Sequence, residues 1–174
     1  RTSKKTLRGK SQSRFMDCET RGDFKGPEFM RICHLITTIE RGGAEKQLLL
    51  LVGQQVSSGN HVTVISLKGR PDLKKDFEAI GAIVDDSPSS KGWFKKIALT
   101  KQLLTKDFDI VHAHLPVSEI IASWAVSGKK LIVTRHNTET LLRGILRPLS
   151  PLTASWVEHR SLACIAISDN VKRF

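Results

Sequence analysis

Short apolar segments alternate with longer segments of helical period along most of the chain. The apolar segments are rich in β-branched residues and are bounded by glycine or polar turn residues, which is typical of buried strands. We predict six strands, over residues 32–36, 61–67, 82–84, 109–114, 131–134 and 164–167. Between them the pattern predicts five helices, over residues 44–56, 73–80, 93–104, 119–126 and 152–162.

This regular order of strand and helix is the pattern of a parallel sheet. Each crossover helix brings the chain back to start the next strand in the same direction, and the helices cover the sheet. The strands are also continuously apolar, as strands buried on both sides are. The sequence therefore predicts the α/β fold class, with a parallel sheet and helices on both faces, in a domain over residues 30–174.

The two ends of the chain differ from this domain. Residues 1–29 carry eight Lys or Arg and four Asp or Glu without any apolar period, so we predict a disordered tail or non-native upstream sequence. Met30 resembles an initiator methionine, because a predicted strand follows it at once. At the other end, Ser168, Asp169 and Asn170 form a helix N-cap run with four residues left. We expect the chain to be a fragment of a longer protein.

Composition and charge narrow the class of protein. The chain has 174 residues, of which 40% are hydrophobic and 26% charged, as in a single globular domain. No apolar run reaches the roughly 18 residues of a membrane span. Three widely separated cysteines indicate neither a disulfide framework nor a CxxC metal site, so we expect a cytoplasmic protein. The net charge of +11 favours anionic partners, but no nucleic-acid recognition motif accompanies it, and we predict no nucleic-acid partner.

The first strand-to-helix turn contains Gly42 and Gly43. Ligands of open α/β sheets bind beyond the carboxyl ends of the strands, and glycines there let backbone N–H groups approach an anion at the helix N-terminus. The alternative is a plain turn in which Glu45 complements the helix dipole. The turn lacks the GxGxxG spacing of nicotinamide-binding proteins.

Three histidines follow or end neighbouring strands. His112 and His114 are two residues apart, so their side chains point to the same face, and His136 follows the next strand. This placement indicates a ligand cleft. A His-x-His pair can also chelate zinc, but no third-ligand pattern such as HExxH accompanies it, and we predict no metal site. No GxSxG elbow indicates a serine hydrolase.

Residues 91–106 contain five lysines and no acidic residue. Phe94, Ile97, Ala98 and Leu104 can share one face of a helix there. One interpretation is a helix packed on the sheet with a solvated basic side. The other is docking on an anionic membrane surface, with Trp93 and Phe94 at the lipid interface.

Five motifs, in this order, resemble the N-terminal domain of family 4 glycosyltransferases. They are residues 30–36 (MRICHLI), 41–48 (RGGAEKQL), 109–114 (DIVHAH), 134–137 (TRHN) and 165–168 (IAIS). The resemblance runs from Met30 to Phe174. It implies one half of a GT-B fold, in which two Rossmann-like domains face each other across a cleft.

The resemblance also implies an activity and roles for residues. It implies retaining transfer of a sugar from a nucleotide-sugar donor to a glycan, lipid-linked or small-molecule acceptor, as in polysaccharide biosynthesis, without a metal ion or other cofactor. Gly42 and Gly43 would approach the donor phosphates, and His136 would be the catalytic residue near the transferring sugar. The implied substrate-binding residues are His112, His114, Arg135, Asn137 and Ser168.

The chain departs from the family in one respect. The basic residues and paired glutamates that the family's C-terminal domain offers to the donor are absent, so we expect the chain alone to be inactive. Two other functions stay open: another GT-B enzyme such as a sugar-nucleotide epimerase, and a non-enzymatic anion-binding α/β module. We expect the protein to be located in the cytoplasm, and we further expect it to dock peripherally at the inner face of the membrane.

Overall fold

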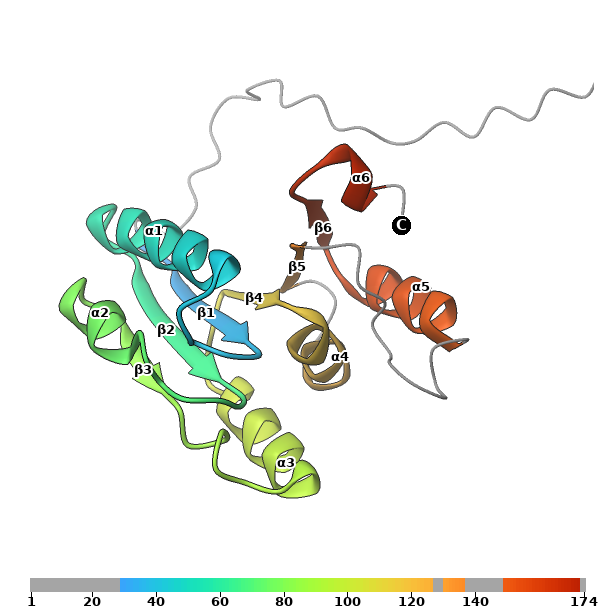
Figure 1. The fold of residues 1–174 in the computed structure, drawn as a ribbon, viewed down its shortest axis with the longest axis horizontal. Coiled ribbons are helices and arrows are strands. Elements are labelled where there is room, and N and C mark those ends of the chain that lie inside the picture. Colours follow the sequence, from blue (N-terminus) through green and yellow to red (C-terminus); the bar gives the residue numbers. More distant parts are fainter. Residues whose placement is uncertain (1–28, 127–129, 137–148, 173–174) are drawn as a thin grey trace, which may run out of the picture.

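The computed structural model describes residues 29–126, 130–136 and 149–172. Its six strands form one sheet (Figure 1). They are β1 (Arg31–Ile36), β2 (His61–Ser66), β3 (Ile83–Asp85), β4 (Ile110–His114), β5 (Leu131–Arg135) and β6 (Ala163–Ala166). The helices are α1 (Gly43–Ser57), α2 (Lys74–Ala79), α3 (Trp93–Leu104), α4 (Pro116–Ala125), α5 (Ser150–Arg160) and α6 (Asp169–Lys172).

All neighbouring strands are parallel, in the order β3-β2-β1-β4-β5-β6. This is the Rossmann order, and it confirms the predicted α/β class. β1 lies at the centre, with β2 on one side and β4 on the other. The chain therefore builds the sheet outward in one direction from β1 and then in the other, and the switch point lies between β1 and β4.

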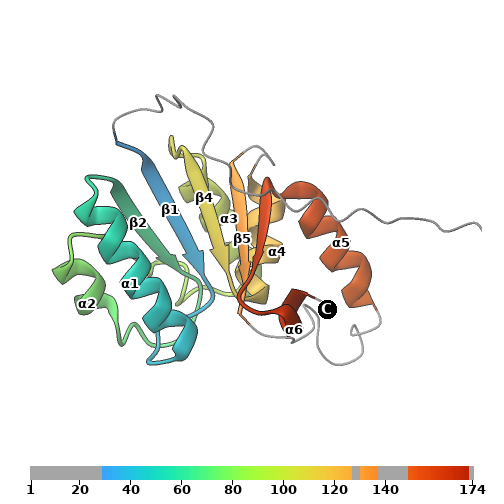
Figure 2. The same ribbon diagram turned by 90° about the horizontal axis from the view of Figure 1, so that it is seen from above.

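Alternate residues of the strands pack into two separate hydrophobic cores, one on each face of the sheet. One core contains Ile32 and Ile36 of β1 with residues of α1 and α2, including Phe77. The other contains Cys33 and Leu35 of β1 with residues of α3, α4 and α5. Figure 2 shows α1 and α2 on one side of the sheet and α3 and α4 on the other. The prediction of helices on both faces is confirmed.

The predicted elements are all present, with ends shifted by a few residues. The largest shift is in α4, which begins at Pro116 instead of residue 119 because proline is well suited to the first turn of a helix. The predicted packing face of α3 is partly wrong. Ile97 and Leu104 pack on the core, but Phe94 is 84% exposed and Ala98 is exposed as well.

One expectation concerns a part of the chain outside this description. Of the predicted tail, residues 1–28 lie outside the described residues. Among the described residues, none of the helices combines the length and hydropathy that crossing a membrane requires.

Candidate functional site

The switch point between β1 and β4 is the place where an open α/β sheet binds its ligand. Helices α1 and α4 begin there, each just beyond the carboxyl end of its strand. Leu115 alone connects β4 to α4, and its backbone has φ 73° and ψ 151°. This is a conformation that L-residues rarely adopt, and strain of this kind concentrates at functional sites.

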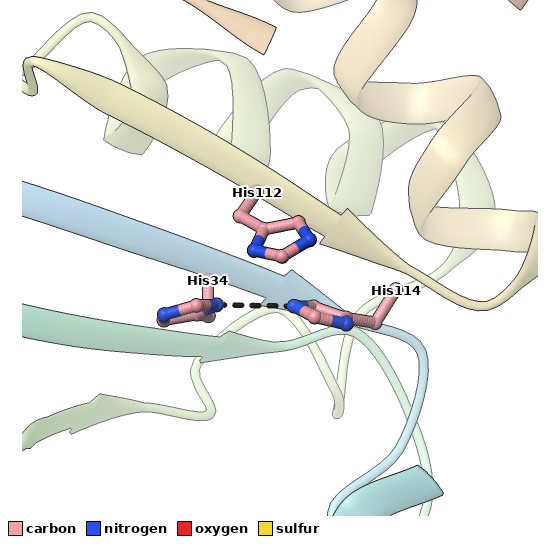
Figure 3. A group of neighbouring side chains, drawn as sticks. All are labelled: His34, His112 and His114. Carbon is pink, nitrogen blue, oxygen red and sulfur yellow. Dashed lines mark hydrogen bonds between the residues drawn. The ribbon is translucent and has the colours of Figure 1, made fainter. Parts of the chain in front are cut away.

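Three histidines lie together beneath this switch point (Figure 3). His34 of β1 and His112 of β4 are partners in the register of the two strands, and His114 lies two residues further on the same face. The three residues are 0%, 7% and 1% exposed, respectively. The ring centroids of His112 and His114 are 4.1 Å apart, and that of His34 is 5.2 Å from each. The prediction that His112 and His114 share a face is therefore confirmed.

Hydrogen bonds connect these rings to three further side chains. His34 Nε2 lies 2.7 Å from Gln55 Oε1 of α1, and His34 Nδ1 lies 3.0 Å from His114 Nε2. His114 Nδ1 in turn lies 3.3 Å from His136 Nε2, just beyond the end of β5. His112 is bonded separately, with its Nε2 2.6 Å from Thr134 Oγ1 of β5.

Burial keeps these imidazoles neutral at pH 7. It lowers the pKa of His34 to about 4 and, with the neighbouring histidines, the pKa of His112 to about 3. The same causes lower the pKa of His114 well below its usual range. Burial also lowers the pKa of His136, against an opposing effect of the Glu45 carboxylate.

Neutral imidazoles are also metal ligands, and one ring nitrogen from each of His34, His112 and His114 lies within 4.8 Å of the other two. However, His34 Nδ1 and His114 Nε2 are 3.0 Å apart, which is a hydrogen-bond distance. Two ligands at the usual 2.0–2.1 Å from a tetrahedral zinc ion are about 3.3 Å apart. The contact between His34 and His114 is therefore explained by hydrogen bonding, and the absence of a metal site stays a prediction.

The glycine turn lies at the start of α1, next to the carboxylate of Glu45. This side chain is 7% exposed and accepts a hydrogen bond from Thr38 Oγ1 at 2.7 Å. A Cβ atom on Gly42 would overlap the Glu45 carboxylate, whereas a Cβ on Gly43 would meet no atom within 4 Å. Gly42 has φ −111°, and Gly43 is not among the described glycines of positive φ. The backbone conformation therefore does not require glycine at either position. The open space at Gly43 is compatible with close approach by a ligand.

The structure does not bring every predicted substrate-binding residue to the histidines. Arg135 follows Thr134 in β5, so its side chain points to the opposite face of the sheet, where it pairs with Glu158 of α5 at 2.7 Å and Glu119 of α4 at 3.5 Å. Ser168 lies after β6, and its Oγ accepts a hydrogen bond from the Val171 N–H at 3.4 Å. Asn137 lies outside the described residues.

The sequence reasoning missed His34, Gln55 and Glu119. His34 is a polar residue in the middle of an otherwise apolar strand, which was a usable signal. Its partners come from residues 21 and 80 positions away, and only the sheet register and the crossing of α1 bring them together. Glu119 is 1% exposed, and burial raises its carboxyl pKa to about 7 although Arg135 acts in the opposite direction.

Comparison with known proteins decides the family. The sequence profile of glycosyltransferase family 4 matches residues 41–174. The chain belongs to glycosyltransferase family 4. The match includes the glycine turn, His112, His114 and His136 of this family 4 chain, and it confirms the family that the five motifs predicted.

Other comparisons add less to the description of this family 4 chain. A search of curated proteins found no match. A solved structure titled "Crystal Structure Analysis of the Glycotransferase of kitacinnamycin" is similar with 15% sequence identity and a TM-score of 0.44, covering 75% of this chain. The family 4 chain spans 36% of the length of that protein.

Proposed function

We propose that this family 4 chain is the acceptor-binding half of a retaining glycosyltransferase. The whole enzyme would move a sugar from a nucleotide-sugar donor to a glycan, lipid-linked or small-molecule acceptor, without a metal ion. The observation that carries the proposal is the family match over residues 41–174, which includes both the glycine turn and His136. The switch point of the sheet gives these residues a common place at the carboxyl ends of β1, β4 and β5.

The glycine turn would receive the donor diphosphate. The N-terminus of α1 carries a partial positive charge, and Gly43 leaves open space beside it. The Glu45 carboxylate already lies in the first turn of this helix, and because carboxylate and phosphate oxygens both accept hydrogen bonds, an incoming phosphate would have to displace it. In the full-length enzyme, Gly43→Val is expected to weaken use of the donor while the fold is kept, because a branched side chain fills the space of approach.

The histidines would face the sugar. His136 is half-buried beyond β5, and its Nδ1 has no hydrogen-bond partner in the described part of the chain. A neutral imidazole in this position can bind a sugar hydroxyl. His114 lies directly behind His136, and His112 supports His114 by ring contact, which would place both at the inner wall of the site.

Metal-independent transfer is part of the same proposal. Both ring nitrogens of His34 and of His114, and Nε2 of His112, are already engaged in hydrogen bonds with one another or with Gln55, His136 and Thr134. Treatment of the full-length enzyme with a chelator such as EDTA should therefore leave the transfer rate unchanged. A loss restored by added Zn²⁺ or Mg²⁺ would contradict this part of the proposal.

The decisive experiment is an assay of the full-length reading frame with a panel of nucleotide sugars, measuring both transfer and donor hydrolysis. His136→Ala should reduce the rate by about 100-fold or more if the ring acts on the reacting sugar. His159→Ala, at an exposed histidine of α5, is the matched control and should retain activity. Conversion of the donor to its epimer without transfer would favour the epimerase, and binding of anions without any turnover would favour the non-enzymatic module.

We further propose that α3 docks the protein from the cytoplasm on an anionic membrane that holds a lipid-linked acceptor. Trp93 is 53% exposed and Phe94 is 84% exposed, so both rings are available to a lipid interface. The exposed lysines of the same segment, residues 91–106, would meet the lipid headgroups. They are Lys91, Lys95, Lys101 and Lys106, with Lys96 half-buried.

A further inference from the structure

A row of hydrogen bonds leads from α1 through the sheet to His136. It runs from Gln55 Oε1 to His34 Nε2, from His34 Nδ1 to His114 Nε2, and from His114 Nδ1 to His136 Nε2. Each bond joins a different pair of atoms, and both ring nitrogens of His34 and His114 are used. We name these four side chains the histidine relay.

Each bond of the histidine relay needs one proton, and a neutral imidazole carries only one N–H. The amide oxygen of Gln55 can only accept, so His34 Nε2 must donate to it. His34 Nδ1 is then a lone pair, and it must accept from an N–H at His114 Nε2. By the same rule, His114 Nδ1 accepts from an N–H at His136 Nε2.

The end of the row is a defined chemical state of His136. Its single proton is on Nε2, so Nδ1 carries a lone pair. This Nδ1 is buried and has no hydrogen-bond partner among the residues that the structure describes. Burying an acceptor without a partner is unfavourable, and a ligand hydroxyl donating to Nδ1 would recover that cost.

We propose that Gln55, His34 and His114 are positioning residues that fix the tautomer of His136, so that its Nδ1 accepts a hydrogen bond from a ligand hydroxyl. The ligand in this statement rests on the proposed function, whereas the tautomer follows from the relay alone. The burial that keeps the rings neutral at pH 7 supports the assignment of one proton to each ring.

Gln55 determines the polarity of the whole row. It is half-buried in α1, and turning its amide by 180° would offer an N–H to His34 Nε2. Every proton of the relay would then move to the other ring nitrogen, and His136 Nδ1 would become a donor. A residue more than three helical turns into α1 from the glycine turn thus sets whether His136 accepts or donates.

The test uses ¹⁵N NMR of the histidine side chains in the 174-residue chain without substrate. Protonated and unprotonated imidazole nitrogens have well-separated ¹⁵N shifts, so each tautomer is read directly. In the wild-type chain we expect His136 to be protonated on Nε2 and unprotonated on Nδ1. Gln55→Glu, whose carboxylate only accepts, should keep this state, and Gln55→Lys, whose ammonium only donates, should invert it. Gln54→Glu and Gln54→Lys make the same charge changes at an exposed neighbour and should change neither.

A second measurement needs no variant. Two N–H···N bonds, between His34 and His114 and between His114 and His136, should give through-hydrogen-bond couplings between their nitrogens in the wild-type chain. The proposal is overturned if the couplings are absent, if His136 carries its proton on Nδ1, or if the folded Gln55 variants share one His136 tautomer. It is also overturned if the ring nitrogens show metal-bound shifts. Neither a sugar donor nor a sugar acceptor is present in these measurements. Their outcomes therefore do not depend on whether the full-length enzyme transfers sugar.

Discussion

The buried neutral imidazoles make the stability of the domain depend on pH. The folded pKa values of His34 and His112, about 4 and about 3, lie below the ordinary value of 6.5. Between pH 6.5 and 4 the unfolded chain therefore binds more protons, and the free energy of unfolding falls as pH falls. Each histidine that stays neutral contributes about 1.4 kcal/mol per pH unit in this window. Urea unfolding of the chain at pH 7.5, 6 and 5 measures the slope.

Glu119 provides an internal control for this slope. Its folded pKa of about 7 lies above the usual 4.5, so between those values its contribution to stability falls as pH rises, opposite to the histidines. Glu119→Gln removes the opposing effect and should make the loss of stability between pH 7 and 5 steeper. A stability that is flat from pH 7.5 to 5 in both proteins would contradict the neutral histidine cluster.

Arg135 is expected to act on stability rather than on substrate binding. Its side chain is 15% exposed and faces the 1% exposed carboxylate of Glu119, away from His112 and His114. Arg135→Met removes the counter-charge of this carboxyl and raises its pKa further above 7, so the domain should lose about 1–3 kcal/mol, with the larger loss at pH 8, where the carboxyl would otherwise ionise. Urea unfolding checks this, and Arg135→Met/Glu119→Leu should recover most of the loss. In the full-length enzyme, a raised KM at unchanged stability would instead restore the substrate-binding role.

At the scale of elements, the connection between β4 and α4 stores backbone strain at Leu115, whose φ is 73°. The side chain also packs on the core beneath α1 and α2, so truncation to alanine costs packing while keeping the strained φ. Leu115→Gly should be more stable than Leu115→Ala by about 1 kcal/mol, because glycine accepts positive φ without penalty. At exposed Leu50, inside α1, the order should be reversed by about 1 kcal/mol. Thermal unfolding of the four variants compares the two pairs, and the same order at both positions would exclude strain at Leu115.

Helix α3 is expected to bind anionic vesicles through its lysines and exposed rings. Each engaged lysine contributes about 1 kcal/mol near an anionic surface, and salt screens this attraction over about 8 Å at physiological ionic strength. Lys95→Glu/Lys96→Glu should therefore abolish co-sedimentation with vesicles of phosphatidylserine and phosphatidylcholine. Lys46→Glu/Lys75→Glu, at exposed positions of α1 and α2, makes the same charge change and should retain it. Equal binding to neutral vesicles, or equal loss in both double variants, would contradict docking through α3.

At the scale of the whole molecule, the periodicity of the sequence predicted the strands, the helices and their parallel arrangement. Those features depend on local pattern, such as the β-branched run from His61 to Ser66. The strand order was not predictable in this way, because nothing local states that β1 pairs with β4. The prediction of the candidate site was incomplete for the same reason. His112 and His114 were found by their spacing, but His34 lies beside them only because of the register of β1 on β4. Arg135 was grouped with His136 in the sequence although neighbouring strand residues point to opposite faces.

The central place of β1 has a consequence for the order in which the chain folds during synthesis. The elements from β1 to β3 can assemble early, because β1 and β2 pair over a short stretch of chain. The other edge of β1 must wait for β4, since His34 and His114 are 80 residues apart in the sequence. Contacts of such separation form late and slow the folding of parallel sheets. Until β4 has emerged from the ribosome, one side of the nascent β1 is an unpaired edge. This edge can bind chaperones or pair with strands of other chains.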